Sequence, residues 1–235
     1  MSEFIDVKEN LNEVHKKIEQ ACKRSGRDLS EVTLICVSKT KPIEMLKEAL
    51  LAGEHEFGEN KVQEIVEKKP QLDENARFHM IGHLQTNKVK QVIDKVVLIH
   101  SVDSKHLADE INKEAAKKGI IVNILIEVNV ANEDTKYGVS EEETEELVRY
   151  CAVLSNVKVC GLMTIAPFVN NPEDNRLVFR KIKNLCVDLT SKNIDNINMS
   201  IISMGMTGDY EVAIEEGSTM VRVGTGIFGS RNYNI

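Results

Sequence analysis

The stretch Ile120-Ile121-Val122-Asn123-Ile124-Leu125-Ile126-Glu127-Val128 is an almost continuous apolar run that is rich in β-branched residues. Such a run is typical of a parallel strand covered on both faces, whereas a strand with one wet face alternates apolar and polar residues. A helical stretch precedes the run and another follows it, and this order implies right-handed strand–helix–strand crossovers. The run therefore predicts a parallel α/β fold.

The same alternation repeats along the chain. Counting eight strand-like runs favours a single (β/α)8 TIM-type barrel, a closed α/β fold. An open doubly wound sheet is the alternative, although the turn Ser38–Pro42 lacks the glycines of a dinucleotide-binding loop. The second run is the weakest of the eight. The predicted strands are Val32–Val37, Glu56–Gly58, Arg77–Ile81, Val96–Ile99, Val122–Val128, Lys158–Leu162, Met199–Ile202 and Met220–Val223.

Helical patterns fill the spaces between these runs, and an extra N-terminal helix comes before the first. Between Phe4 and Lys23 apolar residues recur at steps of three and four, and Ser25-Gly26 ends the pattern. We expect this helix, within residues 1–26, to pack on the barrel. No linker or shift in composition divides residues 1–235, so one domain is expected. The other predicted helices are Pro42–Leu51, Lys61–Lys68, Lys88–Ile93, His106–Lys118, Glu141–Leu154, Glu173–Leu189 and Tyr210–Glu215.

Composition narrows the classes of function. A net charge of −7 over 235 residues argues against a nucleic-acid partner or an anionic membrane surface, and aromatic residues are too few for a base-stacking platform. The five cysteines include no CxxC pair, which suits a reducing compartment. The start, Met1–Asp6, lacks the features of a signal peptide, and no stretch reaches the ~20 apolar residues of a membrane span. We expect a soluble cytoplasmic protein.

Lys39 is the first candidate for chemistry. In a parallel barrel all strand ends open onto one face, where the active site is built. Lys39 directly follows the first strand and shares a strand face with Val37 and Ile35, so it is drawn toward the barrel mouth. A partly buried amine can form a Schiff base with an aldehyde, although a surface lysine at a strand end is an equal alternative. Lys41 is expected to be solvated.

Two loops of small residues follow the seventh and eighth strands. They are Ser203–Asp209 and Gly224–Gly229, and in barrels these two positions form the usual phosphate site. Small residues allow several backbone N–H groups to converge on a phosphate. Together with Lys39, these loops suggest a phosphorylated carbonyl ligand. Arg222 lies inside the last strand, where a charge needs a partner, and a structural carboxylate is the simplest one. No histidine or carboxylate spacing indicates a metal site.

The chain resembles the YggS/PROSC family of pyridoxal phosphate homeostasis proteins. The resemblance runs from about Val32 to Tyr233, and although each short motif is weak, their occurrence in this order is specific. Thr207 stands where a serine is common and keeps the hydroxyl group. The motifs are Val37–Pro42, Phe57–Glu64, Phe78–Lys88, Gly161–Thr164, Ser203–Thr207 and Val221–Gly229.

The resemblance implies a barrel like the N-terminal domain of alanine racemases, with pyridoxal 5′-phosphate (PLP) bound as an aldimine at Lys39. It implies that Ser203 and the Gly224-Thr225 backbone hold the phosphate, that Arg222 faces the pyridine nitrogen, and that Asn60 lines the pocket. The roles of Lys41 and Lys136 stay open. The cofactor-binding residues expected from the resemblance are Lys39, Asn60, Ser203, Met204, Gly205, Arg222, Gly224 and Thr225.

Three functions compete. The resemblance favours a monomeric PLP-binding protein of vitamin B6 homeostasis without established turnover, with apo-forms of PLP enzymes as transient partners. The alternative is a PLP-dependent amino-acid racemase, and a barrel with a vestigial site and an interaction role is the third. An arginine at the ring nitrogen weakens the ring as an electron sink, since a like charge disfavours its protonation. This argues against aminotransferase-type chemistry, but such an arginine is also compatible with a racemase. Racemases of this barrel type also use a second domain, whereas this sequence ends at Ile235, a few residues after the eighth strand. We therefore expect no catalytic residues beyond cofactor binding.

Overall fold

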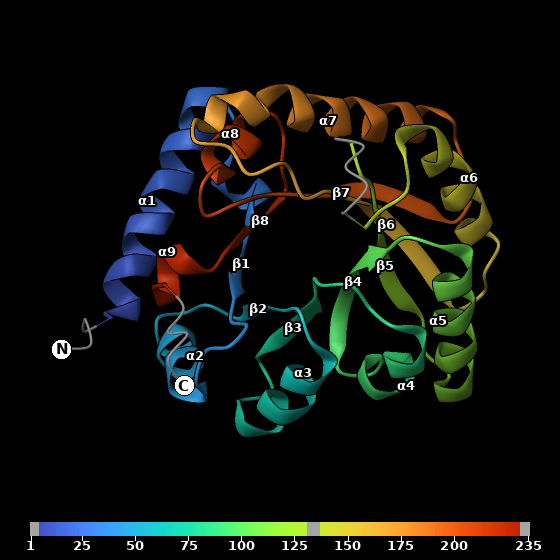
Figure 1. Cartoon of the computed structure of the whole chain (residues 1–235), viewed down its shortest axis with the longest axis horizontal. Helices are drawn as coiled ribbons and strands as arrows, with labels where there is room; N and C mark the ends of the chain where they lie inside the picture. Colours follow the sequence, from blue (N-terminus) through green and yellow to red (C-terminus); the bar gives the residue numbers. More distant parts are fainter. Residues whose placement is uncertain (1–4, 131–136, 231–235) are drawn as a thin grey trace.

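The computed structural model describes residues 5–130 and 137–230. Eight parallel strands pair in sequence order, and β1 pairs with β8 to close a barrel (Figure 1). The predicted (β/α)8 TIM-type barrel is therefore confirmed, and the open sheet is excluded. The strands are β1 Thr33–Val37, β2 Glu56–Glu59, β3 Arg77–Met80, β4 Val96–Val102, β5 Val122–Glu127, β6 Val157–Met163, β7 Ile197–Met206 and β8 Met220–Val223.

Two strands run further than their apolar pattern predicts. β4 continues through His100 and Ser101, and β7 continues through Ser203 to Met206, where the sequence predicts a loop. The sequence pattern ends at these polar or small residues because a strand interior is normally apolar. In the structure the inner face of the barrel accepts His100 and Ser203 because each is hydrogen-bonded there.

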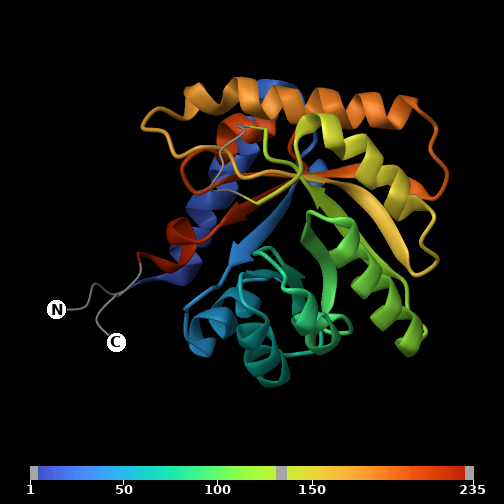
Figure 2. The same ribbon diagram turned by 45° about the vertical axis from the view of Figure 1, so that its right-hand side comes forward.

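Helices cover the outside of the barrel (Figures 1 and 2). The short helix α9 was not predicted, because Gly224-Thr225-Gly226 indicates a loop. Helix α7 starts later than predicted, since a 3-10 turn occupies Pro172–Asn175. The helices are α1 Val7–Ser25, α2 Ile43–Leu51, α3 Val62–Lys68, α4 Val89–Val92, α5 Lys105–Lys118, α6 Glu141–Ala152, α7 Arg176–Ser191, α8 Tyr210–Glu215 and α9 Thr225–Phe228.

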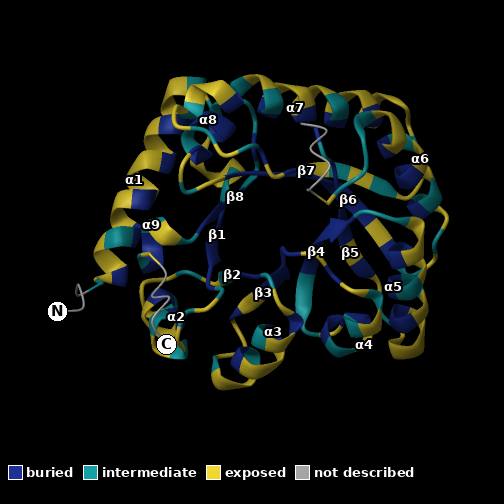
Figure 3. Ribbon diagram, viewed as in Figure 1, coloured by how far each residue is buried: buried dark blue, intermediate teal, exposed yellow. Residues whose placement is uncertain are grey.

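Alternate residues of each strand serve two separate layers. In β1, Leu34 and Cys36 join the large apolar cluster between barrel and helices, whereas Ile35 lies on the opposite, inner face. That large cluster is continuous from Val7 in α1 to Phe228 in α9, which supports the single domain that we propose. Figure 3 shows the result, with buried strands at the centre and helices exposed on their outer faces.

The N-terminal helix α1 lies against α8 and α9 (Figures 1 and 2). All of its predicted apolar positions are buried, and Gly26 ends it in a left-handed conformation (φ 68°) while donating to the carbonyls of Cys22 and Lys23. Within residues 5–130 and 137–230, no helix has both the length and the apolar content needed to cross a bilayer.

Candidate functional site

Lys39 lies where the sequence placed it, directly after β1 at the carboxyl end of the barrel, and it is half-buried. Its strand is flanked by β8, with Ile35 opposite Arg222, and by β2, with Val37 opposite Gly58. Lys39 and Arg222 therefore belong to neighbouring strands of one wall.

A buried ion-pair cluster, which the sequence did not reveal, fixes the backbone on both sides of Lys39. The Lys68 ammonium donates to the Ser38 carbonyl (2.8 Å), to Glu59 Oε1 (2.8 Å) and to Glu64 Oε2 (2.7 Å). The Ser38 hydroxyl also donates to Glu59 Oε1 (2.7 Å), and the Thr40 N–H donates to Glu64 Oε2 (2.7 Å). The residues before and after Lys39 are thus held by the same cluster, which we call the Lys68 cluster.

The charge balance of this cluster depends on burial. Burial raises the pKa of Glu59 above its usual value, and the Lys68 ammonium opposes the shift. One oxygen of Glu59 takes both hydrogen bonds, while Oε2 is buried with no hydrogen-bond partner in the part of the chain described. Lys68 is therefore the main group that keeps this carboxylate charged inside the protein.

Lys41 has a structural position, and the prediction that it is solvated is wrong. Its ammonium donates to the carbonyls of Phe228 (2.7 Å), Gly229 (2.9 Å) and Ser230 (3.0 Å). Carbonyls at the end of a helix lack partners within the helix, so a lysine is favoured there. Lys41 thus joins the end of the loop between β1 and α2 to the end of α9. Lys136 lies outside the described residues.

The end of β8 lies against β1. A Cβ added at Gly224 would stand 3.2 Å from the Val37 carbonyl oxygen, so any side chain there would push into the end of the lysine strand. The Gly224 N–H donates to the Thr207 hydroxyl (3.2 Å), which connects the two loops that the sequence predicts as a phosphate site. Thr225 is exposed and begins α9. Because Gly224 has no side chain, its backbone borders the end of the strand that leads to Lys39.

Ser203, Met204 and Gly205 face different directions. The Met204 side chain is fully buried in the outer apolar cluster, so only its backbone could meet a ligand at the mouth. Gly205 has φ 87°, and a Cβ there would lie 2.5 Å from Ala213 Cβ. Ser203 is also fully buried, on the inner face, and its hydroxyl is bound by Arg222 and His100. The predicted segment is at the mouth, but its side chains are engaged with the protein.

Arg222 projects into the barrel and is 4% exposed. Its guanidinium donates to Ser203 Oγ (2.6 Å) and to the Thr164 carbonyl (2.8 Å), which are neutral acceptors rather than the expected carboxylate. Burial lowers the pKa of Arg222 to about 10, and the negative charges of Glu127 and Asp209 oppose this shift. Arg222 therefore keeps its positive charge at neutral pH.

Glu127 is a second titratable group at the mouth. The sequence pattern does not single it out, because it lies within the apolar run of the fifth strand. It ends β5, is 5% exposed, and lies within electrostatic reach of Arg222. Burial raises the pKa of Glu127 to about 7, and Asp103 raises it further while Arg222 lowers it. A carboxyl group with such a pKa can gain or lose a proton near neutrality.

Asn60 follows β2 at the same end of the barrel. Its Oδ1 atom is buried and has no hydrogen-bond partner within the described ranges. Its backbone is pressed against Gly82, where a Cβ would stand 2.6 Å from the Asn60 carbonyl oxygen. A buried acceptor without a partner is costly, so it indicates a place for a ligand that donates a hydrogen bond.

At the same end of the barrel, His83 stacks on Tyr137 with ring centroids 3.9 Å apart. Its Nδ1 atom lies 3.6 Å from Asp103 Oδ2. These groups come from the loops after β3, β4 and β5. Among the described residues, no group of three or more histidine, cysteine, aspartate or glutamate side chains is arranged to hold a metal ion.

The chain matches the alanine racemase N-terminal domain model over residues 10–232. It is 50% identical over 226 residues to the pyridoxal phosphate homeostasis protein of Aquifex aeolicus, covering 96% of this chain and 98% of the relative. Among solved structures, PipY of Synechococcus elongatus with PLP bound is 30% identical, with a TM-score of 0.83 over 95% of this chain and 100% of PipY.

An alanine racemase of Clostridium difficile shares the fold at 15% identity and a TM-score of 0.75, and this chain covers 57% of it. The barrel, its order of elements and the near-complete match to homeostasis proteins lead to the same assignment. The chain belongs to the pyridoxal phosphate homeostasis protein family, whose barrel is of the alanine racemase N-terminal-domain type.

Proposed function

We propose that this protein binds PLP at the carboxyl end of the barrel and acts in vitamin B6 homeostasis. The observation that carries the proposal is the position of Lys39, held by the Lys68 cluster beside Gly224 and one strand away from Arg222. The PLP-bound relative PipY and the homeostasis relative of Aquifex aeolicus support it. The cofactor would supply an aldehyde for covalent attachment and a ring that can accept electrons.

Two features of the mouth fit such a ligand. The buried Asn60 Oδ1 atom lacks a hydrogen-bond partner among the described residues, and a ring hydroxyl is a donor of the kind it needs. Gly224 has no Cβ to crowd the end of β1, where one would stand 3.2 Å from the Val37 carbonyl oxygen. We propose that the backbone of Met204-Gly205 and Gly224-Thr225 binds the phosphate, and that Lys39 condenses with the aldehyde and releases water.

Arg222 gives the site its electrostatic character. Its hydrogen bonds go to neutral acceptors rather than to a carboxylate, so in our proposal it is a cation that faces the ring nitrogen. A neighbouring cation disfavours protonation of that nitrogen. The ring would then stabilise a carbanion less well, which supports binding and delivery rather than turnover. We accordingly propose a PLP carrier that is not an enzyme.

The test of this proposal compares PLP with pyridoxal, which lacks the phosphate. PLP should bind with a visible absorption band, and pyridoxal should bind far more weakly, because charge-assisted hydrogen bonds are the strong ones. Lys39→Ala should abolish the band, whereas Lys61→Ala, an exposed lysine at the same end of the barrel, should retain it. Equal affinity for both vitamers, or a band that survives in Lys39→Ala, would refute the proposed site.

A racemase-like enzyme is the second candidate, and Glu127 is the observation that favours it. Racemisation needs acid–base groups on both faces of the Cα proton, and a carboxyl group with a pKa near 7 beside the mouth could serve as one of them. Incubating the PLP-loaded protein with L-amino acids in deuterated water distinguishes the two functions. We expect negligible Cα exchange; multiple turnovers that are lost in Lys39→Ala would establish the enzyme.

The proposal also covers the cellular location and the oligomeric state of the protein. All five cysteines are free and buried, as suits a reducing compartment, and we propose a cytoplasmic location. We further propose a monomer whose transient partners are the apo-forms of PLP enzymes. Sedimentation of the purified protein, alone and with an apo-enzyme, measures both points.

A further inference from the structure

A row of polar side chains, all of them buried except the partly exposed Glu56, crosses the inside of the barrel, and the proposed binding site does not account for it. It begins at the floor, where His79 Nε2 lies 2.6 Å from Glu56 Oε2. His79 Nδ1 lies 3.0 Å from His100 Nε2, and His100 Nδ1 lies 3.0 Å from Ser203 Oγ. Arg222 completes the row at the mouth with its 2.6 Å bond to Ser203 Oγ. We call these five residues the inner chain.

The two ends of the inner chain fix the direction of every hydrogen bond in it. A guanidinium has only donors, so Ser203 Oγ accepts from Arg222. At the floor, Glu56 is paired with Arg77 (3.0 Å) and is therefore an ionised acceptor. With one ring proton on each histidine, the groups between these ends all donate toward the floor. The Ser203 hydroxyl donates to His100 Nδ1, His100 Nε2–H donates to His79 Nδ1, and His79 Nε2–H donates to Glu56.

The reverse direction is disfavoured by the surroundings. It would need a second proton on His79 and would leave the Ser203 hydroxyl hydrogen without an acceptor among the residues that the structure describes. Burial, together with the nearby His79 and Arg222, lowers the pKa of His100 well below its usual range. The charged groups that act on the inner chain are Glu56 and Arg77 at the floor, and Arg222 with Glu127 and Asp209 at the mouth. His100, in the middle of the inner chain, is thus neutral, and charged groups lie at the two ends.

We propose that Ser203 and His100 are positioning residues for Arg222, and that the Ser203 hydroxyl serves this arginine rather than the cofactor's phosphate. A phosphate oxygen is an acceptor, whereas the only proton of Ser203 is already donated to His100. His79 and Glu56 hold His100 in the one tautomer that accepts from Ser203. The inference rests on the proposed function in one respect, namely that Arg222 faces the cofactor ring.

The first test uses the protein without cofactor and so does not depend on PLP binding. Nitrogen-15 NMR of the histidine side chains should show both His79 and His100 as neutral Nε2–H tautomers between pH 6 and 8, with His79→Gln and His100→Gln giving the assignments. In Ser203→Ala the Arg222 guanidinium signals should exchange faster with water. An Nδ1–H or doubly protonated His100, or unchanged Arg222 signals in Ser203→Ala, would overturn the proposal.

The second test separates the two roles of Ser203 by comparing ligands. If Ser203 binds the phosphate, Ser203→Ala lowers the affinity for PLP and leaves that for pyridoxal unchanged. If it positions Arg222, the affinities for both vitamers fall by the same factor, and the absorption spectrum of the bound cofactor shifts. We expect the second result, and we expect Ser203→Ala to add nothing in an Arg222→Met background. A loss confined to PLP would overturn the proposal.

Ser101→Ala is the matched control, because Ser101 is also a fully buried serine of the barrel and its hydroxyl has no hydrogen-bond partner among the described residues. It should leave both affinities unchanged. If neither PLP nor pyridoxal binds the wild-type protein, the proposed function fails, while the tautomers measured without cofactor still decide the inner chain.

Discussion

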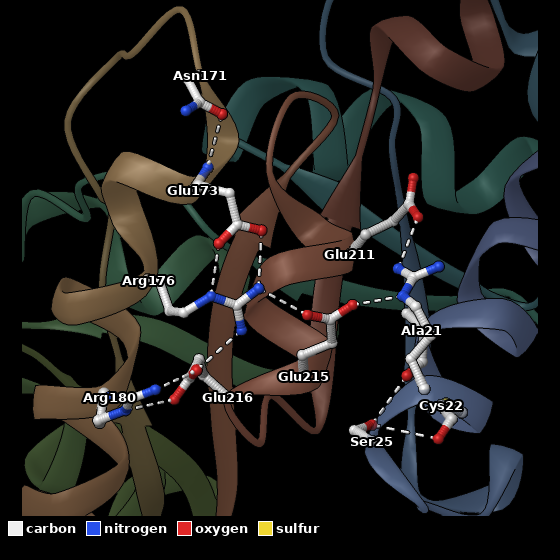
Figure 4. Close-up of polar contacts among 11 residues, drawn as sticks. Ala21, Cys22, Ser25, Asn171, Glu173, Arg176, Arg180, Glu211, Glu215 and Glu216 are labelled. Carbon is white, nitrogen blue, oxygen red and sulfur yellow. Dashed lines mark hydrogen bonds and ion pairs between the residues drawn. The ribbon is translucent and has the colours of Figure 1, made fainter.

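The inner chain lies inside the barrel, whereas a cluster of charged side chains lies on the outer surface. Their polar contacts are similar in length, but the first group is largely shielded from solvent and the second is exposed to it. On the surface, Arg176 bridges Glu173, Glu215 and Glu216 at 2.7–2.9 Å (Figure 4). Arg24 of α1 joins the same cluster through Glu215 (2.6 Å). The distances match those inside the barrel, yet the Arg176 side chain is 26% exposed and Arg222 is 4% exposed.

Exposure to solvent determines how much each region contributes to the stability of the protein. Water and salt screen exposed ion pairs, which stabilise a protein by roughly 0–1 kcal/mol each. In a buried network, removal of one member leaves its partners without hydrogen bonds or charge compensation. The surface cluster therefore joins α1, α7 and α8 weakly, whereas the buried groups position Lys39 and Arg222. Substitutions in the two regions should differ accordingly.

The largest effect on stability is expected at the Lys68 cluster, which is also buried. Lys68→Met leaves the Glu59 carboxylate without its cation, and breaking a buried pair costs about 3–5 kcal/mol of unfolding free energy. Urea unfolding at pH 8 measures the loss. Burial already raises the pKa of Glu59, so the loss should shrink as the pH falls and the carboxyl is protonated. The double variant with Glu59→Gln should recover part of the stability; a loss below 1 kcal/mol would contradict the account.

Glu127 should give the next largest effect, as a pH dependence. Its pKa is raised from 4.5 to about 7, so the folded protein holds a proton that the unfolded chain releases. This stabilisation is complete below pH 4.5 and is lost as the pH rises to 7, which amounts to roughly 3 kcal/mol. Glu127→Gln should flatten that part of the profile of unfolding free energy against pH. Identical slopes for the wild type and the variant would show that Glu127 is not buried as described.

The smallest effect is expected at the surface cluster. Arg176→Ala should lower the unfolding free energy by about 1 kcal/mol at low salt, and by less in 0.5 M NaCl, where the Debye length is only a few ångströms. Urea unfolding at two salt concentrations measures this. Arg149→Ala, which removes a single exposed pair with Glu145, is the control. A loss as large as that in Lys68→Met would erase the distinction between the two regions.

The sequence predicts much of the fold because each strand and helix is a local pattern. All eight strands lie where the apolar runs indicate, and the apolar face of α1 is the buried one. The strand pattern also places Lys39 just after β1 and Arg222 inside β8, where the structure has them. Successive side chains of a strand point to opposite faces, so Met204 and Ser203 lie on different faces of β7. This alternation could have shown that the Met204 side chain points away from the inside of the barrel.

The inner chain could not be predicted from local patterns. Glu56, His79 and His100 lie on three neighbouring strands and meet Ser203 only because the barrel closes around them. Lys68 ends a helix, and nothing in the helical pattern connects it to Ser38, thirty residues away. Contacts of this kind depend on the register between strands and on helix packing. They become visible only in three dimensions.

The central claim is that Lys39 holds the cofactor, and one measurement tests it most directly. The protein is loaded with PLP, reduced with borohydride and digested, and the pyridoxyl-labelled peptide is identified by mass spectrometry. We predict that the label lies on Lys39, because the Lys68 cluster holds this lysine at the mouth whereas the Lys41 ammonium is bound to the end of α9. Recovery of the label mainly on Lys41 or Lys136 would contradict the account.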